Sequence, residues 1–446
     1  MKPALLCISQ SFPPQTTPTA IRAGKLLQRL SEQWDVTVLT EGEGPHGVEG
    51  VRVQTVSSRP PTRLLATIRR LRLDKLIELA VWPDHSIFWV LPAIRAGRRL
   101  IRKQRPSAIV VFMMPYSAGL AGVALSRLTR VPLVLNLDDS PTCSDMHPYF
   151  PTALHFRAAR ALEDAYARRA DATVYVSGTN LAAIRERQPA EVREKLHLVR
   201  YGADRAEIEP GNGHGQCFEI AYVGAMSGWW ALIEQSDPPS LARRAFRMWN
   251  RLGRYRHAEL DERTSSPAVI GRAIAATVGE HPDWAGRIRL SIHGNPYPEE
   301  VVARALAGAG VQEVVEVSGP IPHDRVAQLF ADSDLLFLTL PSRPDGTPGG
   351  RISAKTYEYL ATDRPILAAV PPGENWDYLS GKAGVWLVDP SDWQRMKDVI
   401  GGLARAKFAG RPMSFDRSGL AAELSYDTRA AEFDAVIRTA IARRGG

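Results

Sequence analysis

The regular order of apolar runs and polar loops constrains the fold of this chain more than any other feature of its sequence. Ala4–Ile8 is a short apolar run, and the next loop holds Phe12–Pro14, where two prolines exclude a central strand or helix. Apolar residues of Ile21–Leu30 then recur at helical spacing, and Val36–Leu39 is the next strand. A strand that reaches its neighbour through a helix is the unit of a parallel sheet. The chain therefore begins as an α/β domain.

The same alternation continues to about residue 205 and then starts again after a polar segment rich in Gly, Asp, Glu and Pro. Further strands are expected at 108–112, 133–137, 172–176 and 196–199, and then at 219–223, 288–292, 314–317, 335–338, 366–369 and 384–388. We predict two doubly wound domains, and we place the boundaries as follows: an N-terminal domain at 1–205, a linker at 206–215, a second domain at 216–415 with an insertion at about 229–266, and a C-terminal helical segment at 416–446 that packs back on the first domain.

Length and composition agree with a folded protein of this kind. The chain has 446 residues, of which 44% are hydrophobic and 23% are charged, so two domains can each bury a core. Cys7, Cys143 and Cys217 are scattered, which indicates a reducing compartment and neither a disulfide framework nor a zinc site. The sequence offers no apolar stretch long enough for a bilayer and no signal-peptide core, and we expect a cytoplasmic protein.

Positive charge is concentrated in one segment. The net charge is +8, and the segment 59–105 alone carries twelve Lys or Arg against three acidic residues. Within it, Arg63–Leu79 has leucines at helical spacing with basic residues between them, as in a helix that lies on an anionic bilayer. Peripheral contact with the inner face of the membrane is one interpretation, and a solvated face of an arginine-rich protein is the other. Nucleic acid is not expected, because aromatic residues are not interleaved with the basic ones.

Two doubly wound domains joined by a linker resemble the GT-B fold, in which two Rossmann-like domains face each other across a cleft. The strongest local match is the string GRISAKTYEYLA at Gly350–Ala361, which precedes Arg364-Pro365-Ile366-Leu367 and is similar to the donor-binding loop and helix of family 4 glycosyltransferases. A glycine-rich turn that leads into a helix N-terminus suits a diphosphate, because free backbone N–H groups point towards it. In the family, the glutamate at the position of Glu358 holds the ribose hydroxyls of the nucleotide, and a carboxylate can accept both.

The resemblance implies a set of site residues on both domains. The donor-binding set, on the second domain, consists of Gly224, His323, Gly350, Arg351, Ser353, Lys355 and Glu358. On the first domain, Asp138 and Asp139 follow a strand and are the catalytic candidates, because a carboxylate there orients an acceptor hydroxyl or takes its proton. A helix-capping role is the alternative for either aspartate. Arg22 and Thr17, near the start of the first helix, are candidates for an acceptor or a phosphate group.

The reaction implied is transfer of a sugar from a sugar nucleotide to a hydroxyl of a glycan, a lipid-linked or a small-molecule acceptor, as in polysaccharide biosynthesis. The family is mostly retaining and needs no metal ion, so no metal site and no cofactor are expected, and the sugar nucleotide is a substrate. The sequence also departs from the family. Gly350 stands where many members have a second glutamate, and Ala225 stands where they have a phosphate-binding arginine. Two alternatives therefore stay open, namely a sugar-nucleotide epimerase of the same fold and a non-catalytic binding protein.

Overall fold

The computed structural model describes residues 2–445 apart from 43–46, 146–147, 206–215, 225, 227, 237–239 and 295–296, and it does not describe the side chains of 323 and 324. The predicted linker at 206–215 therefore lies outside the described residues, as does Ala225. The chain divides into two compact units, which are described separately. The first unit consists of Met1–Gly202, Met248–Ala258 and Leu424–Gly446, and the second of Ala203–Arg247 and Glu259–Glu423.

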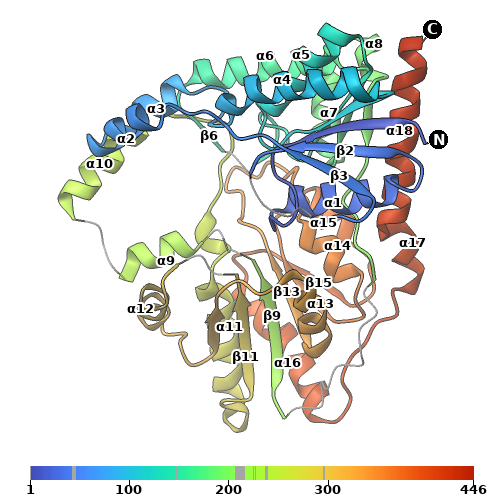
Figure 1. The fold of residues 1–446 in the computed structure, drawn as a ribbon. Helices are drawn as coiled ribbons and strands as arrows, with labels where there is room; N and C mark the ends of the chain where they lie inside the picture. Colours follow the sequence, from blue (N-terminus) through green and yellow to red (C-terminus); the bar gives the residue numbers. More distant parts are fainter. Residues whose placement is uncertain are drawn as a thin grey trace. The chain divides into compact units, whose positions relative to one another are not determined.

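The first unit is built on a seven-stranded sheet whose strands all pair in parallel, in the order β3-β2-β1-β4-β5-β7-β8 (Figure 1). The direction in which strands are added reverses between β1 and β4, which is the topological switch point of a doubly wound fold. The strands are β1 (Ala4–Ser9), β2 (Asp35–Thr40), β3 (Val51–Thr55), β4 (Ala108–Phe112), β5 (Leu133–Leu137), β7 (Ala172–Tyr175) and β8 (Leu196–Leu198).

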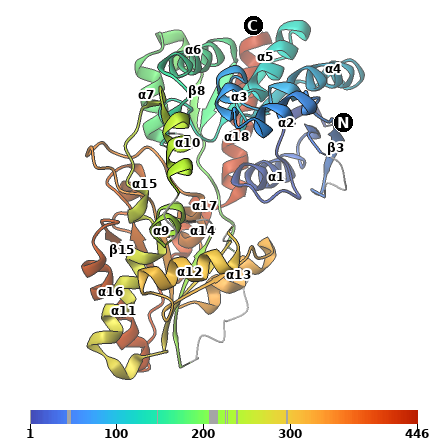
Figure 2. The same cartoon turned by 90° about the vertical axis from the view of Figure 1, so that its left-hand side faces the viewer.

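Helices cover both faces of this sheet because its central strands are apolar on both sides. Leu6 and Ile8 pack on the face covered by α4 and α5, whereas Leu5 and Cys7 pack on the face covered by α1 and α18. Figure 2 shows α18, from the end of the chain, beside α1 from its beginning. The helices are α1 (Pro18–Leu30), α4 (Ile87–Gln104), α5 (Ala118–Thr129), α6 (Ala153–Arg169), α7 (Gly178–Glu186), α8 (Ala190–Arg193) and α18 (Tyr426–Gly445).

The second unit repeats this architecture with a six-stranded parallel sheet in the order β12-β11-β9-β13-β14-β15. Its switch point lies between β9 and β13. The strands are β9 (Phe218–Val223), β11 (Ile288–His293), β12 (Val315–Ser318), β13 (Leu335–Thr339), β14 (Ile366–Ala369) and β15 (Val385–Val388). The helices are α9 (Trp229–Ser236), α11 (Pro267–Glu280), α12 (Glu299–Ala309), α13 (His323–Asp332), α14 (Ala354–Leu360), α15 (Glu374–Leu379), α16 (Trp393–Phe408) and α17 (Ala421–Leu424), with 3-10 turns at 262–264, 282–284 and 418–420. The expected fold class, two Rossmann-like domains, is confirmed.

The segment 229–266 is more ordered than a loop with one helix. It forms α9, α10 (Leu241–Arg251) and β10 (Tyr255–Arg256), and β10 pairs antiparallel with β6 (Tyr149–Phe150) of the first unit. Aromatic packing supports this two-stranded ribbon, since the ring centroid of Phe156 lies 4.8 Å from that of Tyr255. Part of the predicted insertion therefore belongs to the first unit.

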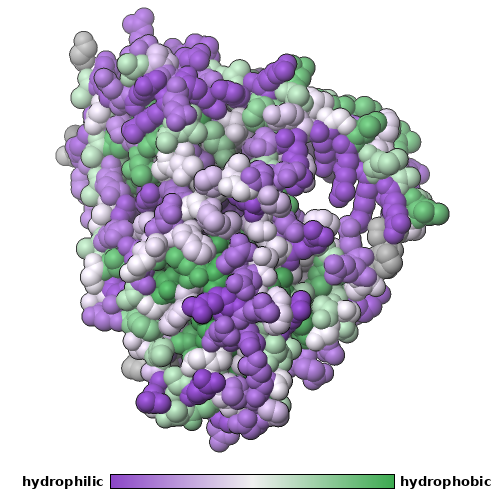
Figure 3. Space-filling model, turned by 180° about the vertical axis from the view of Figure 1, so that it is seen from behind, coloured by the Kyte–Doolittle hydropathy of each residue, from purple (hydrophilic) through white to green (hydrophobic). Residues whose placement is uncertain are grey.

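The segment Arg63–Leu79 forms two helices and not the single helix that the spacing of its leucines predicts. These are α2 (Thr62–Arg70) and α3 (Asp74–Ala80), and the backbone breaks between them at Arg72, where φ is +57°. Neither α2 nor α10 buries a single side chain. Apolar residues lie beside hydrophilic ones on the surface at this edge of the molecule (Figure 3). Within the described ranges, no helix combines the length and the apolar character that crossing a bilayer requires.

Candidate active site

In the second unit, Gly224 and Lys355 meet at the carboxyl end of β9. Gly224 has φ +110°, a conformation that L side chains rarely adopt, and it ends the strand in a tight turn. A Cβ atom on Gly224 would lie 3.1 Å from Nζ of Lys355, so the glycine lets the ammonium group come close to the backbone. Lys355 belongs to the first turn of α14. The two expected donor-binding residues are therefore brought together.

The Lys355 ammonium is held by an aromatic ring and not by a carboxylate. Its Nζ lies 5.1 Å from the ring centroid of Tyr222, a cation–π contact. Within the described part of the chain, no acidic side chain pairs with it. Glu358 lies on the same helix, is half-buried and has no hydrogen-bond partner among the described residues. A cation and a carboxylate thus lie one turn apart on α14, and neither has an ion-pair partner among the described residues.

The loop that leads into α14 is fixed by a close contact between two glycines. Gly349 N donates to the carbonyl of Pro372 at 3.1 Å, and Glu374 N donates to the carbonyl of Gly349 at 2.9 Å. A Cβ atom on Gly373, where φ is +138°, would lie 2.3 Å from the Gly349 oxygen, so only glycine fits. This contact positions the buried Gly350 and the half-buried Arg351 just before the helix. Ser353 is the N-cap residue, and its hydroxyl makes no capping hydrogen bond.

His293 is a polar residue at this strand edge that the donor-binding set from the sequence did not include. Its carbonyl accepts from Gly224 N at 2.6 Å, and its Nδ1 lies 2.6 Å from the hydroxyl oxygen of Ser318. Burial lowers the pKa of His293 and so favours the neutral imidazole, and its Nε2 is buried without a partner. His323 begins α13, and its side chain lies outside the described residues.

In the first unit, Arg22 and Asp138 form an internal ion pair. Arg22 is fully buried, and its guanidinium donates to the carbonyls of Val199 (2.8 Å) and Arg200 (2.7 Å). Its Nε lies 3.5 Å from Oδ1 of Asp138, which is 3% exposed. Buried charges are stable only when paired in this way. Arg22 is therefore not placed to meet a phosphate, and Asp138 is not placed to meet an acceptor.

Asp139 and Thr17 are more accessible. The Asp139 carboxylate is half-buried and accepts a hydrogen bond of 3.0 Å from the Ser144 hydroxyl, and its carbonyl accepts one from Tyr116. Thr17 caps α1, since its Oγ1 accepts from Ala20 N at 3.2 Å. Of the two catalytic candidates from the sequence, Asp139 is thus the one with an accessible carboxylate.

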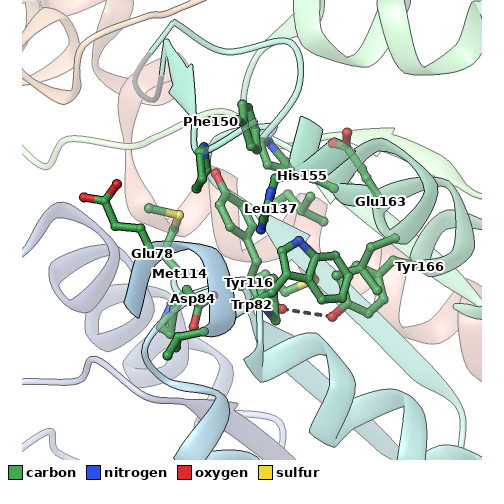
Figure 4. Close-up of a pocket in the computed structure, with 18 of the residues that line it drawn as sticks. Glu78, Trp82, Asp84, Met114, Tyr116, Leu137, Phe150, His155, Glu163 and Tyr166 are labelled. Carbon is green, nitrogen blue, oxygen red and sulfur yellow. Dashed lines mark hydrogen bonds between the residues drawn. The ribbon is translucent and has the colours of Figure 1, made fainter. Parts of the chain in front are cut away.

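A cavity of about 360 Å³ opens at the carboxyl ends of β4 and β5 of the first unit, a few residues from Asp139. The loop after α3, the loop after β4, the end of β5, β6 and α6 all contribute to it (Figure 4). Trp82, Tyr116 and Tyr166 gather on one side of it, and the Tyr166 hydroxyl donates to the Tyr116 carbonyl at 3.0 Å. The sequence alone did not indicate this cavity. The string Met113–Tyr116, directly after a strand at the switch point, was the signal that could have indicated it.

Burial changes the titration of Glu163 and Tyr116, two of the groups that line this cavity. Glu163 is 1% exposed, and burial raises the pKa of its carboxyl group against the opposing effect of Arg187. Its Oε2 accepts from Thr142 and Arg187 at 2.6 Å each, while its Oε1 has no partner. The pKa of Tyr116 is raised well above its usual range by burial and by the nearby charges of Asp139 and Glu163. Tyr116 therefore stays protonated as a hydrogen-bond donor.

No candidate metal centre emerges from the residues that the structure describes, since they contain no cluster of three or more His, Cys, Asp and Glu side chains that could hold an ion.

Comparison with known proteins finds a family model that is similar to part of the first unit. Residues 19–202 match the glycosyl transferase 4-like domain, a range that contains Arg22, Asp138, Asp139 and the cavity. Among proteins with curated descriptions, no sequence matches this chain.

Several solved structures share the fold over the whole chain. HepE from Anabaena, in complexes with UDP and with UDP-glucose, has TM-scores of 0.60 and 0.62 at 13% and 12% identity, and the matches cover 98% and 97% of this chain and 100% and 99% of that one. Sucrose-phosphate synthase from Thermosynechococcus elongatus has a TM-score of 0.63 at 13% identity and covers 99% of this chain and 100% of its own. Trehalose 6-phosphate synthase from Burkholderia multivorans has a TM-score of 0.58 at 15% identity, with 100% and 98% covered. Residues 19–202 are thus similar to a glycosyl transferase 4-like domain, and the whole chain shares the fold of these solved structures.

Proposed function

We propose that the second unit binds a nucleoside-diphosphate sugar and that the chain transfers its glycosyl group to an acceptor hydroxyl with retention of configuration and without a metal ion. The observation that carries this proposal is the Lys355 ammonium beside Gly224, which has no acidic partner in the described part of the chain. A diphosphate would supply the missing negative charge. Glu358 would accept hydrogen bonds from the two ribose hydroxyls, because an ionised carboxylate only accepts.

On the acceptor side, Asp139 is our candidate for orienting the hydroxyl that attacks the sugar. Its carboxylate keeps one oxygen towards Ser144, and it follows β5, where doubly wound domains place their ligand residues. Arg22 and Asp138 would support it indirectly by holding the end of β5 in place. The anomeric configuration of the product, read by NMR, tests retention.

A thermal-shift screen of UDP, GDP, ADP and dTDP tests donor binding, with UDP first because the HepE complexes hold it. A nucleotide at about 100 times its dissociation constant adds roughly 2.7 kcal/mol, or about 5 to 10 °C for a unit of this size. Lys355→Met should abolish most of this shift. Lys382→Met is the matched control, since Lys382 also lies over a tyrosine ring of the second unit, 5.3 Å from the centroid of Tyr378. Equal shifts in both variants would contradict the proposal.

Analysis of the products formed from the nucleotide sugars that bind separates the alternatives left open by the sequence. If the protein converts a sugar nucleotide into a stereoisomer and no acceptor gains mass, it is an epimerase. Binding with neither transfer nor hydrolysis indicates a non-catalytic protein. Transfer of mass to an acceptor supports the function proposed here.

We also propose that α2 and α10 rest on an anionic membrane surface. Both helices bury nothing, and exposed apolar side chains project from them and from the residues that follow them. These are Leu64, Leu71, Met248, Trp249 and Leu252, each at least half exposed. Lys75 of α3, the helix after α2, ties this region to the end of α10, because its ammonium donates to the carbonyls of Trp249 and Leu252 at 3.0 and 2.6 Å. Apolar residues flanked by Arg and Lys are typical of segments that lie in a membrane interface.

A further inference from the structure

The cavity of the first unit offers a ligand mainly apolar surface, because most of its polar groups are already engaged. Both oxygens of Asp84 accept from Ser117, at 2.6 Å from the hydroxyl and 2.9 Å from the backbone N–H. His155 lies between the Thr152 hydroxyl (2.8 Å) and the Leu79 carbonyl (3.1 Å), so that Nε2 donates and Nδ1 accepts. What remains towards the cavity are rings, thioethers and alkyl groups, including those of Trp82, Met114, Phe150 and Leu162.

The charge around the cavity excludes an anion. Glu78, Asp84 and Glu163 line it, and among the described residues no Lys or Arg does. A phosphate or a carboxylate placed there would lose its hydration and gain no cation in return. The nucleotide and its diphosphate therefore do not belong in this cavity, whose volume of about 360 Å³ lies within the usual range for small-molecule sites.

The cavity is continuous along the chain with the helices that expose apolar side chains. Glu78 of α3 and Val81 and Trp82, which directly follow α3, line it. On its other flank, α3 is tied to the segment after α10, where Arg254 donates to both oxygens of Glu78 at 2.9 and 3.0 Å. An apolar chain that leaves a membrane surface at α2 and α10 would therefore meet the cavity at the end of α3.

We infer that this cavity binds the hydrocarbon chain of a lipid acceptor and so presents the head-group hydroxyl near Asp139. The inference deepens the proposed function, since it names the acceptor class, and it rests on that function. The wall of the cavity towards Asp139 supports this orientation. Leu137 lines the cavity two residues before Asp139, and Tyr116 lines it while its hydroxyl donates to the Asp139 carbonyl at 3.2 Å.

Calorimetric titration of the complete chain with n-hexyl, n-octyl and n-decyl glucosides, each below its micelle concentration and without any nucleotide, tests the inference. Each methylene that enters the cavity should increase the affinity about fourfold. Octanoate, with an anionic head on a similar chain, should bind much more weakly than octyl glucoside. Phenyl glucoside is the aromatic probe, and it should bind more weakly than the octyl compound. Affinity that does not grow with chain length, or phenyl glucoside that binds as well as octyl glucoside, would overturn the lipid assignment.

Two variants place the binding in this cavity. Ala159→Phe fills it from α6, because Ala159 is buried and lines it, and octyl glucoside binding should fall more than tenfold. Ala161→Phe makes the same change at an exposed position two residues later on α6 and should bind as wild type does. Met114→Gln, in the loop after β4, is a second variant for the case in which Ala159→Phe does not fold. Unchanged binding in the folded cavity variants would place the alkyl chain elsewhere. Because no nucleotide is present, this failure would leave the nucleotide thermal shift intact, whereas loss of that shift alone would count against the proposed function.

Discussion

Glu358 lies one turn after Lys355 on α14, and no partner within the described residues engages its carboxylate. If it accepts the ribose hydroxyls, Glu358→Gln exchanges one acceptor oxygen for a donor group. The loss of a charge-assisted hydrogen bond costs about 1.5–3 kcal/mol, or roughly 10- to 150-fold in nucleotide affinity. Isothermal titration with the best nucleotide of the screen measures the change.

Two controls accompany Glu358→Gln. One is a nucleotide without the two ribose hydroxyls, and the other is the same substitution at an exposed glutamate of the second unit. A 2′,3′-dideoxy nucleotide should bind the wild type weakly and should lose almost nothing more in Glu358→Gln, because the same contact is missing in both. Glu299→Gln, on the exposed first turn of α12, should bind like the wild type. If Glu358→Gln binds the nucleotide with wild-type affinity, Glu358 does not accept hydrogen bonds from the ribose and is only a surface residue of α14.

Glu163 predicts a pH dependence of stability. Burial raises the pKa of its carboxyl group in the folded chain, so the folded state keeps a proton that the unfolded chain releases near pH 4.3. The stability that comes from this proton is complete below about pH 4.3 and is lost as the pH rises through the raised pKa. Glu163→Gln should therefore gain stability relative to wild type as the pH rises across this window. Urea unfolding between pH 4 and pH 7 tests this, and a constant difference between the two proteins would contradict it.

At the residue scale, the sequence could predict which side chains carry charge at a strand end or a helix start, and it could not predict which of them are buried. Arg22 sits on a helix that begins after a loop, where an arginine is normally exposed. Its burial depends on two carbonyls at Val199 and Arg200, which are far away in the sequence. The cavity was missed for the same reason, because its walls come from segments between Glu78 and Tyr166 that only the folded sheet brings together.

At the element scale, liposome sedimentation tests whether α2 and the segment after α10 bind an anionic membrane surface. Anionic liposomes should sediment the protein at low salt and release it at high salt, because each basic residue near the surface contributes about 1 kcal/mol that salt screens. Replacement of Arg69, Arg70 and Arg72 by glutamine should weaken the partition by roughly 100-fold.

The matched control removes the same charge from the second unit. Arg304, Arg395 and Arg411 are all exposed there, and their replacement by glutamine should leave the partition nearly unchanged. Equal losses in the two triple variants would indicate a response to net charge alone. No sedimentation of the wild type at low salt would end the membrane proposal.

At the element scale, prediction succeeded where a strand is fully buried and failed where an element is half-exposed. The runs at 108–112, 133–137 and 366–369 are fully buried and apolar except for Asn136, and the structure places β4, β5 and β14 at these residues. β3 was missed, because its residues alternate between half-buried and exposed at the edge of the sheet. The break between α2 and α3 was missed because neither glycine nor proline marks it.

For the molecule as a whole, we expect activity without a divalent metal ion. The diphosphate would be stabilised by Lys355 and by the backbone before α14, which is the role that Mg²⁺ has in other phosphate sites. Glycosyl transfer should therefore continue at an unchanged rate in excess EDTA. Complete loss in EDTA that Mg²⁺ or Mn²⁺ restores would contradict this arrangement of the donor site.

The overall architecture was the most predictable property of the chain, because periodic apolar runs and one polar linker specify two parallel sheets. The sequence predicted that the C-terminal helical segment returns to the first domain, and it did not indicate that part of 229–266 belongs there too. β10, within the second half of the sequence, pairs with β6, since Tyr255 and Phe156 complete an aromatic cluster that neither segment contains alone.

The place of α18 in the first unit has a consequence for biosynthesis. Phe433 of α18 is fully buried and stacks on Phe112 of β4 with ring centroids 6.1 Å apart, so the last helix is part of the core that the first strands begin. During synthesis, part of one apolar face of β1 and β4 therefore stays uncovered until α18 emerges from the ribosome. The second unit needs nothing beyond Glu423 and can fold before that. We expect the half of the protein that is synthesised first to be completed last, and to depend on chaperones in the interval.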